Sequence, residues 1–321
     1  MAAGLGKRLR PLTDLMPKPM APILNVPVME HILVLLGKHG FTEVVTNLSY
    51  MPDAIREHLG DGSRLGVELT YSEESEPLGT AGGVGKVRSF LGETESFLVI
   101  SGDALTDIDL SAMRSEHEAN AAAGAIGTLA TKHVDDTSEF GVVIAGEDGR
   151  VQGFQEKPDP AEALSDLANC GIYMFRREIF DHFPEPGHHS PAGDDGQPEG
   201  FVDWAMDVLP ALLEGDVPFH VHRFDAYWND IGTVSEFVQG NADALAGDVS
   251  LEGSGEEIEP RVLLGDGAEL GENVDLRGPV VIGPGARIGD GARLRDAVVL
   301  AGAELPPRSV AFGGVFGTDP G

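Results

Sequence analysis

The feature that most constrains the fold is an aliphatic residue that recurs at every sixth position near the C-terminus. The series has seven members, and a glycine directly follows four of them. This spacing is typical of hexapeptide repeats, in which short parallel strands coil into a β-helix with aliphatic side chains inside and Gly, Asn or Asp at the corners. We expect a parallel β-helix of about two coils, which is too short to stand alone and must pack on another part of the protein or on another subunit. The seven residues are Leu264, Leu270, Leu276, Ile282, Ile288, Leu294 and Leu300.

The remainder of the chain predicts an α/β domain. Between residues 43 and 130, short apolar runs alternate with amphipathic stretches, the pattern of a mostly parallel sheet covered by helices. We predict one domain over residues 1–247, an acidic linker over 248–260 and the repeat domain over 261–321. The predicted strands are 43–48, 67–71, 97–101, 124–130 and 219–224, with a hairpin of 141–145 and 151–155. The predicted helices are 52–59, 81–91, 110–120, 201–213 and 234–246, and residues 184–200 predict a surface loop.

The composition excludes several classes of protein. The formal net charge of -31 repels nucleic acid and anionic lipid, whereas 41% hydrophobic residues suffice for a real core. The single cysteine, Cys170, has no intramolecular disulfide partner and suits a reducing compartment. No window approaches the roughly 18 apolar residues of a membrane span. We therefore expect a cytoplasmic protein that binds neither nucleic acid nor a membrane.

A glycine-rich turn with several cations lies at the N-terminus. Residues 2–13 run AAGLGKRLRPLT, and Lys18 follows between two prolines. Backbone N–H groups of Gly4, Leu5 and Gly6 can approach phosphate oxygens closely, and Arg8 and Lys18 can neutralise charge that develops during phosphoryl or nucleotidyl transfer. The Gly-Lys-Ser/Thr ending of a Walker loop is absent. The turn therefore predicts a phosphate site of another kind.

Two aspartates are candidate ligands of a metal ion. Asp103 follows the predicted buried strand 97–101, and ligands of open α/β sheets bind at the carboxyl ends of strands. Asp230 lies in the segment YWNDIG. Mg²⁺ takes one or two carboxylates together with phosphate oxygens and water, so both residues suit it. A turn-forming role for Asp103 and a helix N-cap role for Asp230 are the alternatives, and Asp107 and Asp109 are expected to be cap or loop residues.

These motifs together resemble the sugar-1-phosphate nucleotidyltransferases, also called NDP-sugar pyrophosphorylases. The N-terminal turn is similar to their signature, although Lys7 stands where Thr or Ser is commoner. The block EPLGTAGG at 76–83 most resembles the mannose-1-phosphate guanylyltransferase branch. The resemblance implies a Rossmann-like catalytic domain, a short left-handed parallel β-helix, and a Mg²⁺-dependent transfer from an NTP (GTP, UTP or dTTP) to a sugar 1-phosphate that releases pyrophosphate.

The resemblance also implies roles for individual residues. Arg8 would stabilise the α-phosphate and the leaving pyrophosphate, Lys18 would hold phosphate, and Asp103 and Asp230 would bind the metal. The nucleotide would contact the N-terminal turn and the second glycine-rich block. The residues that this implies for the nucleotide are Gly4, Leu5, Gly6, Gly79 and Gly82.

The sugar phosphate would be recognised by three further segments, EFGVV, FQEKP and NCGIY. By resemblance, Glu156 would accept hydrogen bonds from sugar hydroxyls, Lys157 would pair with the sugar phosphate, and Gly141 and Asn169 would line the ring. A solvated Glu-Lys pair at a strand edge is the alternative for residues 156 and 157.

Other functions stay open at this point. Within the class, a glucose-1-phosphate uridylyl- or thymidylyltransferase is the alternative. From another class, the alternative is a non-catalytic regulatory subunit that binds nucleotide sugars. The presence of Arg8, Asp103, Lys157 and Asp230 disfavours it. An acyltransferase, suggested by the repeats, lacks an evident catalytic histidine there. The β-helix makes self-association plausible.

The start of the sequence departs from the family pattern. Family members carry an apolar strand of about six residues before the glycine turn, whereas Met1 here stands inside the turn. If that strand is central to the sheet, its absence exposes two ladder edges and lowers stability.

Overall fold

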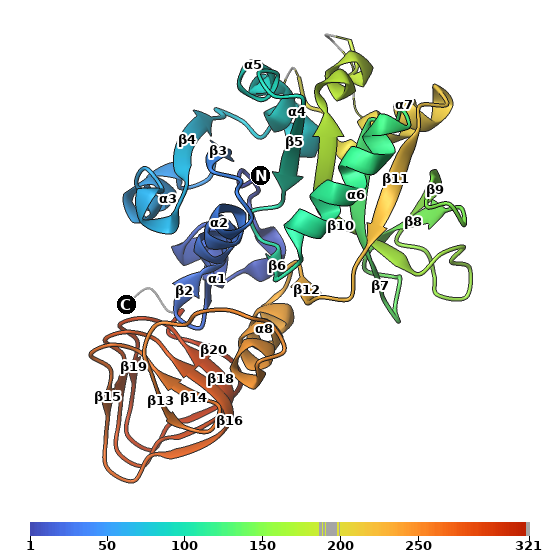
Figure 1. Cartoon of the computed structure of the whole chain (residues 1–321). Helices are drawn as coiled ribbons and strands as arrows, with labels where there is room; N and C mark the ends of the chain where they lie inside the picture. Colours follow the sequence, from blue (N-terminus) through green and yellow to red (C-terminus); the bar gives the residue numbers. More distant parts are fainter. Residues whose placement is uncertain (186–187, 189, 191–197, 199, 319–321) are drawn as a thin grey trace.

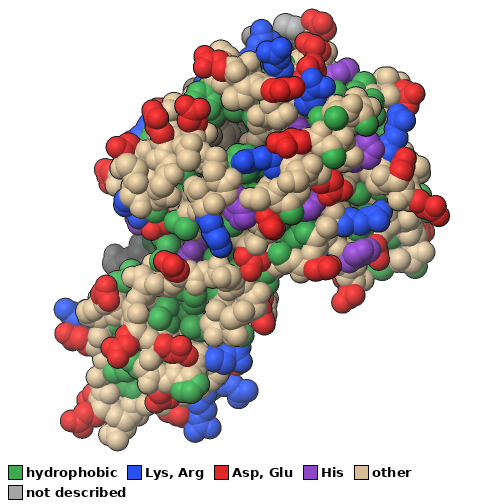
Figure 2. Space-filling view, in the orientation of Figure 1, with side chains coloured by type: hydrophobic (Ala, Val, Ile, Leu, Met, Phe, Trp, Pro, Cys, Tyr) green, Lys and Arg blue, Asp and Glu red, His purple; other side chains and the backbone are tan. Residues whose placement is uncertain are grey.

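The computed structural model has two parts, an α/β domain and a C-terminal stack of short strands (Figure 1). It describes residues 1–185, 188, 190, 198 and 200–318. Within these ranges, none of the helices has the length and apolar character that a membrane crossing needs. Acidic side chains are scattered over the face seen in Figure 2, in keeping with the net charge.

The main sheet of the α/β domain is mixed. Strand β10 (Leu167–Arg176) lies at its centre and pairs antiparallel with β7, β5 and β8, while β11 pairs parallel with β7 and β9 pairs antiparallel with β8. Four of the six strands therefore run in one direction, and β9 and β10 oppose them. The other strands are β5 (Ser96–Ile100), β7 (Gly127–His133), β8 (Gly141–Ala145), β9 (Val151–Glu156) and β11 (Phe219–Arg223).

A second, two-stranded sheet lies beside the first. It consists of β3 (Glu43–Leu48) and β4 (Glu68–Glu73), which pair in parallel. Helices cover the two sheets, and the predicted bounds of β3, of α3 and of α8 are confirmed at both ends. The helices are α2 (Val28–Lys38), α3 (Pro52–Leu59), α4 (Gly79–Lys86), α5 (Arg88–Leu91), α6 (Leu110–Ala122), α7 (Leu209–Glu214) and α8 (Val234–Ala246).

Two predicted helices differ from the structure. The stretch 81–91 is divided into α4 and α5 at Val87, whose backbone leaves helical geometry. The stretch 201–213 begins later, because the Asp203 side chain accepts hydrogen bonds from the N–H groups of Ala205 and Met206 and starts a π-helical turn, Trp204–Val208, ahead of α7. Most of the predicted loop 184–200 lies outside the described residues.

Short elements connect the larger ones and shape the site. The N-terminal turn runs into two 3₁₀ turns around a short helix, and two two-residue strands, β6 and β12, pair with each other. These elements are η1 (Lys7–Leu9), α1 (Leu12–Leu15), η2 (Lys18–Met20), β1 (Pro22–Ile23), β2 (Val26–Pro27), η3 (Ser63–Leu65), β6 (Leu105–Thr106), η4 (Arg177–His182) and β12 (Trp228–Asn229).

The C-terminal strands stack in two sheets. In one sheet Val262 pairs with Val280, and Asp275 pairs with Arg293, in both cases in parallel and 18 residues further along the chain. Each turn of chain therefore spans three of the hexapeptide units. The strands are β13 (Glu256–Glu259), β14 (Val262–Leu264), β16 (Asp275–Ile282), β18 (Arg293–Val299) and β20 (Val310–Phe316) in one sheet, with β15 (Glu269–Leu270), β17 (Arg287–Ile288) and β19 (Glu304–Leu305) in the other.

Three details of this part differ from the expectations. The stacking continues to β20, beyond the last regular repeat residue, so there are more layers than about two coils. Leu270 is 36% exposed and not inside, because its strand β15 is the outermost of its sheet. Within the predicted linker, β13 pairs antiparallel with β14.

The repeat domain packs on the α/β domain through α8. Val281 and Val298 of the repeat domain belong to the same hydrophobic cluster as Phe237 of α8 and Leu105. Of the two expected alternatives, packing on another part of the protein or on another subunit, the structure shows the first (Figure 1).

Candidate functional site

A short antiparallel ladder brings Asp103 and Asp230 to one place. In it, Leu105 of β6 pairs with Asn229 of β12. Asp103 lies two residues before Leu105, and Asp230 follows Asn229 directly, so antiparallel pairing places the two carboxylates at the same end of the ladder. The side chains of Asp107 and Thr106 hold this geometry, because they bond the backbone N–H and C=O of Tyr227. Asp109 caps α6 as expected.

Two cations lie beside the two carboxylates. Lys18 Nζ is 2.6 Å from Asp103 Oδ2, and both side chains are largely buried. A methyl group on Gly232 would lie 3.2 Å from a guanidinium nitrogen of Arg8 and 3.4 Å from Asp230 Oδ1, which places Arg8 next to Asp230. The predicted set of Arg8, Lys18, Asp103 and Asp230 is thus brought together.

The environment of Asp230 disfavours its charge. Burial raises the pKa of this carboxyl above its ordinary value, and the negative charges of Glu236 and Asp103 add to the effect, while Lys18 and Arg8 oppose it. A buried carboxyl whose pKa is raised by burial and by a neighbouring carboxylate is expected where a site lacks its full complement of positive charge. The site therefore favours a further cation.

The residues present fit a magnesium ion. No group of three or more His, Cys, Asp or Glu side chains in the described ranges is arranged as a metal cluster. A protein site for Mg²⁺ with nucleotide needs only one or two carboxylates, because phosphates and water fill the other positions. The Lys18 ammonium already contacts Asp103 as a cation would.

The N-terminal turn is held by hydrogen bonds at Gly6 and is exposed at Gly4 and Leu5. Gly6 has a φ of +59°, and a side chain there would lie 2.9 Å from the Thr13 methyl group. Its carbonyl accepts hydrogen bonds from Thr13 Oγ1 and from the Leu9 N–H. Gly4 and Leu5 are exposed to solvent, so a phosphate would reach their backbone N–H groups.

A buried polar network links this turn to the second glycine-rich block. The Ala2 N–H donates to Asn47 Oδ1, Asn47 Nδ2 donates to Glu74 Oε1, and the Leu78 N–H donates to Glu74 Oε2. Glu74 is only 3% exposed. The sequence analysis missed Asn47 and Glu74, and the only signal was a glutamate between a strand and a glycine-rich loop.

The two glycines of the second block pack closely on a neighbouring segment. A side chain on Gly79 would overlap the Val202 carbonyl, and one on Gly82 would lie 2.5 Å from the Gly200 carbonyl. The Gly82 N–H donates to the Val202 carbonyl at 2.9 Å. Close packing alone therefore requires glycine at both positions, and their contact with a nucleobase stays a prediction.

The residues predicted for the sugar lie around the hairpin of β8 and β9. Gly141 pairs with Glu156 across the hairpin, and a side chain on Gly141 would lie 3.0 Å from a carboxylate oxygen of Glu156. Asn169 of the adjacent β10 accepts a hydrogen bond from the Gly171 N–H at a bulge. Lys157 is exposed with a φ of +45°.

An aromatic contact joins the hairpin to the aspartate ladder. The rings of Phe140 and Trp228 lie 5.4 Å apart, and Trp228 Nε1 donates to the Cys170 carbonyl. Phe140 directly precedes β8, and Trp228 belongs to β12. The hairpin and the carboxylates of Asp103 and Asp230 therefore border one site.

Comparisons with known proteins identify the family of the chain. The family model described as "Nucleotidyl transferase" matches residues 1–247. A UTP--glucose-1-phosphate uridylyltransferase of Synechocystis sp. is 36% identical over 275 residues, 82% of this chain and 67% of that protein. A mannose-1-phosphate guanylyltransferase of Mycobacterium tuberculosis is 35% identical over 248 residues, 77% of this chain and 64% of that protein. The chain thus spans about two thirds of the length of these curated relatives.

The fold has solved counterparts as well. The structure of a Bacillus anthracis protein described as a glucose-1-phosphate thymidylyltransferase superposes with a TM-score of 0.64 at 25% identity. The match covers 78% of this chain and 95% of that one. Since the family model covers the whole α/β domain and both relatives match most of this chain, the chain belongs to the nucleotidyl transferase family.

Proposed function

We propose that this chain transfers a nucleotidyl group from an NTP to a sugar 1-phosphate and releases pyrophosphate. The observation that carries the proposal is the β6–β12 ladder, which gathers Asp103 and Asp230 beside Lys18 and Arg8. The names of the two relatives, both sugar-1-phosphate nucleotidyltransferases, support the same activity.

The proposed reaction is a direct in-line displacement. A phosphate oxygen of the sugar 1-phosphate attacks the α-phosphorus, a new P–O bond forms, and the bond to the bridging oxygen of pyrophosphate breaks. The attacking oxygen is already ionised at neutral pH, so no side chain has to remove a proton. Arg8 and Lys18 offset the charge of the triphosphate, and Lys157 offsets the charge of the sugar phosphate, so that two anions can approach.

We propose Mg²⁺ as the cofactor, with Asp103 and Asp230 as its protein ligands. The ion would supply Lewis-acid charge stabilisation at the phosphates. On nucleotide binding, the Lys18 ammonium is expected to move from Asp103 to a phosphate oxygen, since a carboxylate bound to the ion has less need of that pair.

For the substrates, we propose GTP and mannose 1-phosphate, on the strength of the block at 76–83 and of the guanylyltransferase relative. UTP with glucose 1-phosphate is the second candidate, because the relative with 36% identity carries that name. The test is pyrophosphate release from each of four NTPs paired with mannose, glucose and N-acetylglucosamine 1-phosphates. Release with no pair in the presence of Mg²⁺ favours the regulatory subunit.

We also propose that the described part of the predicted domain 261–321, residues 261–318, forms a left-handed parallel β-helix. The parallel pairing of Val262 with Val280 and of Arg293 with Val310 supports the coil, and the family resemblance supports the hand. Sedimentation of the whole chain beside a chain ending at Gly247 tests whether this domain also mediates self-association.

A further inference from the structure

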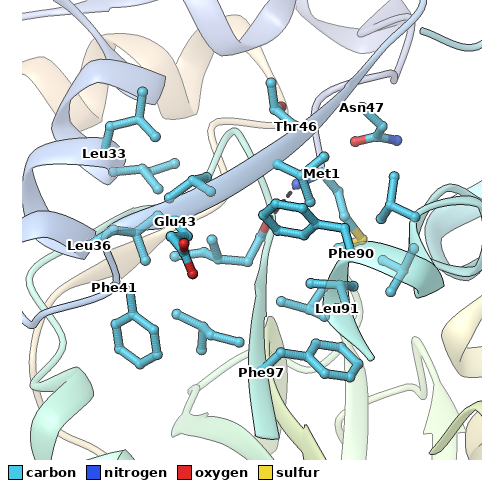
Figure 3. Close-up of a pocket in the computed structure, with 18 of the residues that line it drawn as sticks. Met1, Leu33, Leu36, Phe41, Glu43, Thr46, Asn47, Phe90, Leu91 and Phe97 are labelled. Carbon is cyan, nitrogen blue, oxygen red and sulfur yellow. Dashed lines mark hydrogen bonds between the residues drawn. The ribbon is translucent and has the colours of Figure 1, made fainter. Parts of the chain in front are cut away.

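A carboxylate oxygen of Glu236 is buried and has no partner. Its Oε2 is shielded from solvent and forms no hydrogen bond in the described part of the chain. A buried acceptor without a partner is costly, and a charged one more so, because it has lost its water without a replacement. The hydroxyl of Thr46 is also unpaired, but it borders the largely apolar cavity between α2, β3 and β5 (Figure 3). Glu236 lies elsewhere, among charged side chains.

Three charged side chains converge on Gly232. The position that a methyl group on this glycine would take lies 2.9 Å from Glu236 Oε2 and 3.2 Å from a guanidinium nitrogen of Arg8. Asp230 Oδ1 lies 3.4 Å from the same position. Burial is the main reason why the pKa of Asp230 is raised, and Glu236 adds more to that rise than Asp103 does. Within the ranges that the structure describes, Arg8 forms no ion pair with either carboxylate.

The backbone around Gly232 holds this arrangement. Ile231 has a φ of +44°, a left-handed conformation that is strained for a β-branched residue, and its N–H donates to Asn229 Oδ1 at 2.8 Å. Asn229 Nδ2 in turn donates to the Glu236 carbonyl at 3.4 Å. One side chain of β12 thus ties the turn after Asp230 to the first turn of α8. The Glu236 side chain is therefore held near Asp230.

A role in capping α8 does not account for the Glu236 side chain. Glu236 is the third residue after the N-cap Thr233, which is the position of the glutamate in a capping box. Thr233 Oγ1 accepts a hydrogen bond from the Glu236 N–H at 3.2 Å, as that motif requires. The return bond, from the N-cap N–H to the glutamate, is not made by Oε2, which has no partner among the described residues. The buried oxygen therefore needs another donor.

We propose that Glu236 is a positioning residue: its Oε2 accepts a hydrogen bond from one edge of the Arg8 guanidinium and turns the other edge toward the phosphates of the NTP. A guanidinium can do both, because its N–H groups form a planar fork. Arg8 is exposed, so rotation of its side chain can close the pair. The pair would satisfy the buried oxygen and screen Glu236 from Asp230. The inference rests on the proposed reaction, in which Arg8 offsets the charge of the triphosphate.

The negative charge of Glu236 gives the proposal a specific kinetic signature. A carboxylate near the phosphates repels them, so its removal should not weaken their binding, whereas a misaligned Arg8 slows the chemical step. Glu236→Ala should therefore lower kcat by about 10-fold to 100-fold with the KM for the NTP unchanged or lower. Its affinity for inorganic pyrophosphate, measured by calorimetry, should be at least that of the parent chain. Glu236→Gln, which keeps an acceptor, should restore part of kcat.

A double-mutant cycle and a matched control isolate the pair. Arg8→Lys keeps the charge but lacks the planar fork, so in that background Glu236→Ala should change kcat by at most about twofold. Thr233→Ala removes the cap of the same helix turn and should leave kcat within about twofold of the parent value. Thermal unfolding checks that each variant is folded. A crystal structure with inorganic pyrophosphate should place Glu236 Oε2 within about 3 Å of an Arg8 guanidinium nitrogen.

Three results would overturn the proposal. Additive losses of kcat in the cycle mean that Glu236 acts independently of Arg8. Equal losses in Glu236→Ala and Thr233→Ala mean that Glu236 only supports the start of α8. A structure with pyrophosphate in which Arg8 contacts Asp230 but not Glu236 excludes the pair directly. If the parent chain releases pyrophosphate from no substrate pair, the proposed reaction fails, and the structure with pyrophosphate alone then decides whether the pair forms.

Discussion

Lys18 Nζ lies 2.6 Å from Asp103 Oδ2, and the charges of both residues act on Asp230. A lysine that pairs with a carboxylate before substrates bind holds that side chain in place. If Mg²⁺ binds as proposed, Asp103 would hold the ion and the Lys18 ammonium would be available to a phosphate. This exchange of partners makes each member of the set separately testable.

Asp103→Asn should lower kcat/KM for pyrophosphate release by about 100-fold to 1000-fold, because it removes the proposed metal ligand and leaves Lys18 without its partner. The concentration of Mg²⁺ for half-maximal rate should rise. The matched control is Asp109→Asn, which changes a helix cap nearby and should cost at most about 1 kcal/mol of stability with activity retained. Equal loss in both variants would contradict a metal role for Asp103.

Asp230→Asn should lower activity by a similar factor while raising the melting temperature of the metal-free protein at pH 7. The pKa of Asp230 is raised by burial, so the folded state binds more protons than the unfolded state above pH 3.8, and stability falls as pH rises through that window. The uncharged Asn side chain of the variant removes this loss of stability. Thermal unfolding without Mg²⁺ is the measurement, with the exposed Asp225→Asn as control. A lower melting temperature for Asp230→Asn alone would contradict the predicted gain in stability.

Glu74→Ala should raise the KM for the NTP and destabilise the fold by about 1–3 kcal/mol, since Asn47 and the Leu78 N–H lose a buried acceptor. Urea unfolding and initial rates measure the two effects. Glu76→Ala, an exposed change in the same loop, should alter neither by much. Glu74→Gln, which keeps one acceptor, should restore part of the KM. A variant with lost stability but an unchanged KM would show that Glu74 does not position the nucleotide loops.

The sequence predicted most strands and most helices of the α/β domain, because periodicity is a local signal, but it missed α2 and placed β7 three residues too early. From the same kind of local signal it named the four charged residues that the structure brings together, Arg8, Lys18, Asp103 and Asp230. It could not predict the β6–β12 ladder, since two-residue strands carry no pattern, although this ladder is what joins Asp103 to Asp230. The sequence analysis missed Glu74 for a related reason. A single carboxylate is usually solvated, and only the packing of α4 and β3 around it reveals that it is buried.

The repeat shows the same limit. Its period predicted parallel stacking, and the pairing of Val262 with Val280 and of Arg293 with Val310 agrees with it. The period did not distinguish the middle of the stack from its end, where Leu270 is exposed.

The stability of this chain should rise between pH 6 and pH 8 by about 2 kcal/mol through its terminal amine. Burial lowers the pKa of the Met1 ammonium from 8.0 to about 6, against the pull of Asp103 and Glu74. The unfolded chain therefore binds more protons in this window, and stability increases with pH as that difference is removed. Urea unfolding across the window measures the effect. An acetylated N-terminus should abolish this part of the pH dependence, and an unchanged slope would contradict it.

Gly283→Ala should destabilise the repeat domain by about 1–3 kcal/mol, because a methyl group there would overlap the backbone of Ala301 in the next layer. Gly283 is buried, and its N–H donates to the Val299 carbonyl, so the backbone cannot retreat without losing a pair. Gly314→Ala is the matched control, since its nearest neighbour would be a Phe316 ring carbon at 3.9 Å. Calorimetry of the whole chain measures both variants. Because Val281 and Val298 share a core with α8, the loss should lower the melting temperature of the α/β domain as well, and two independent transitions with only one shifted would contradict that coupling.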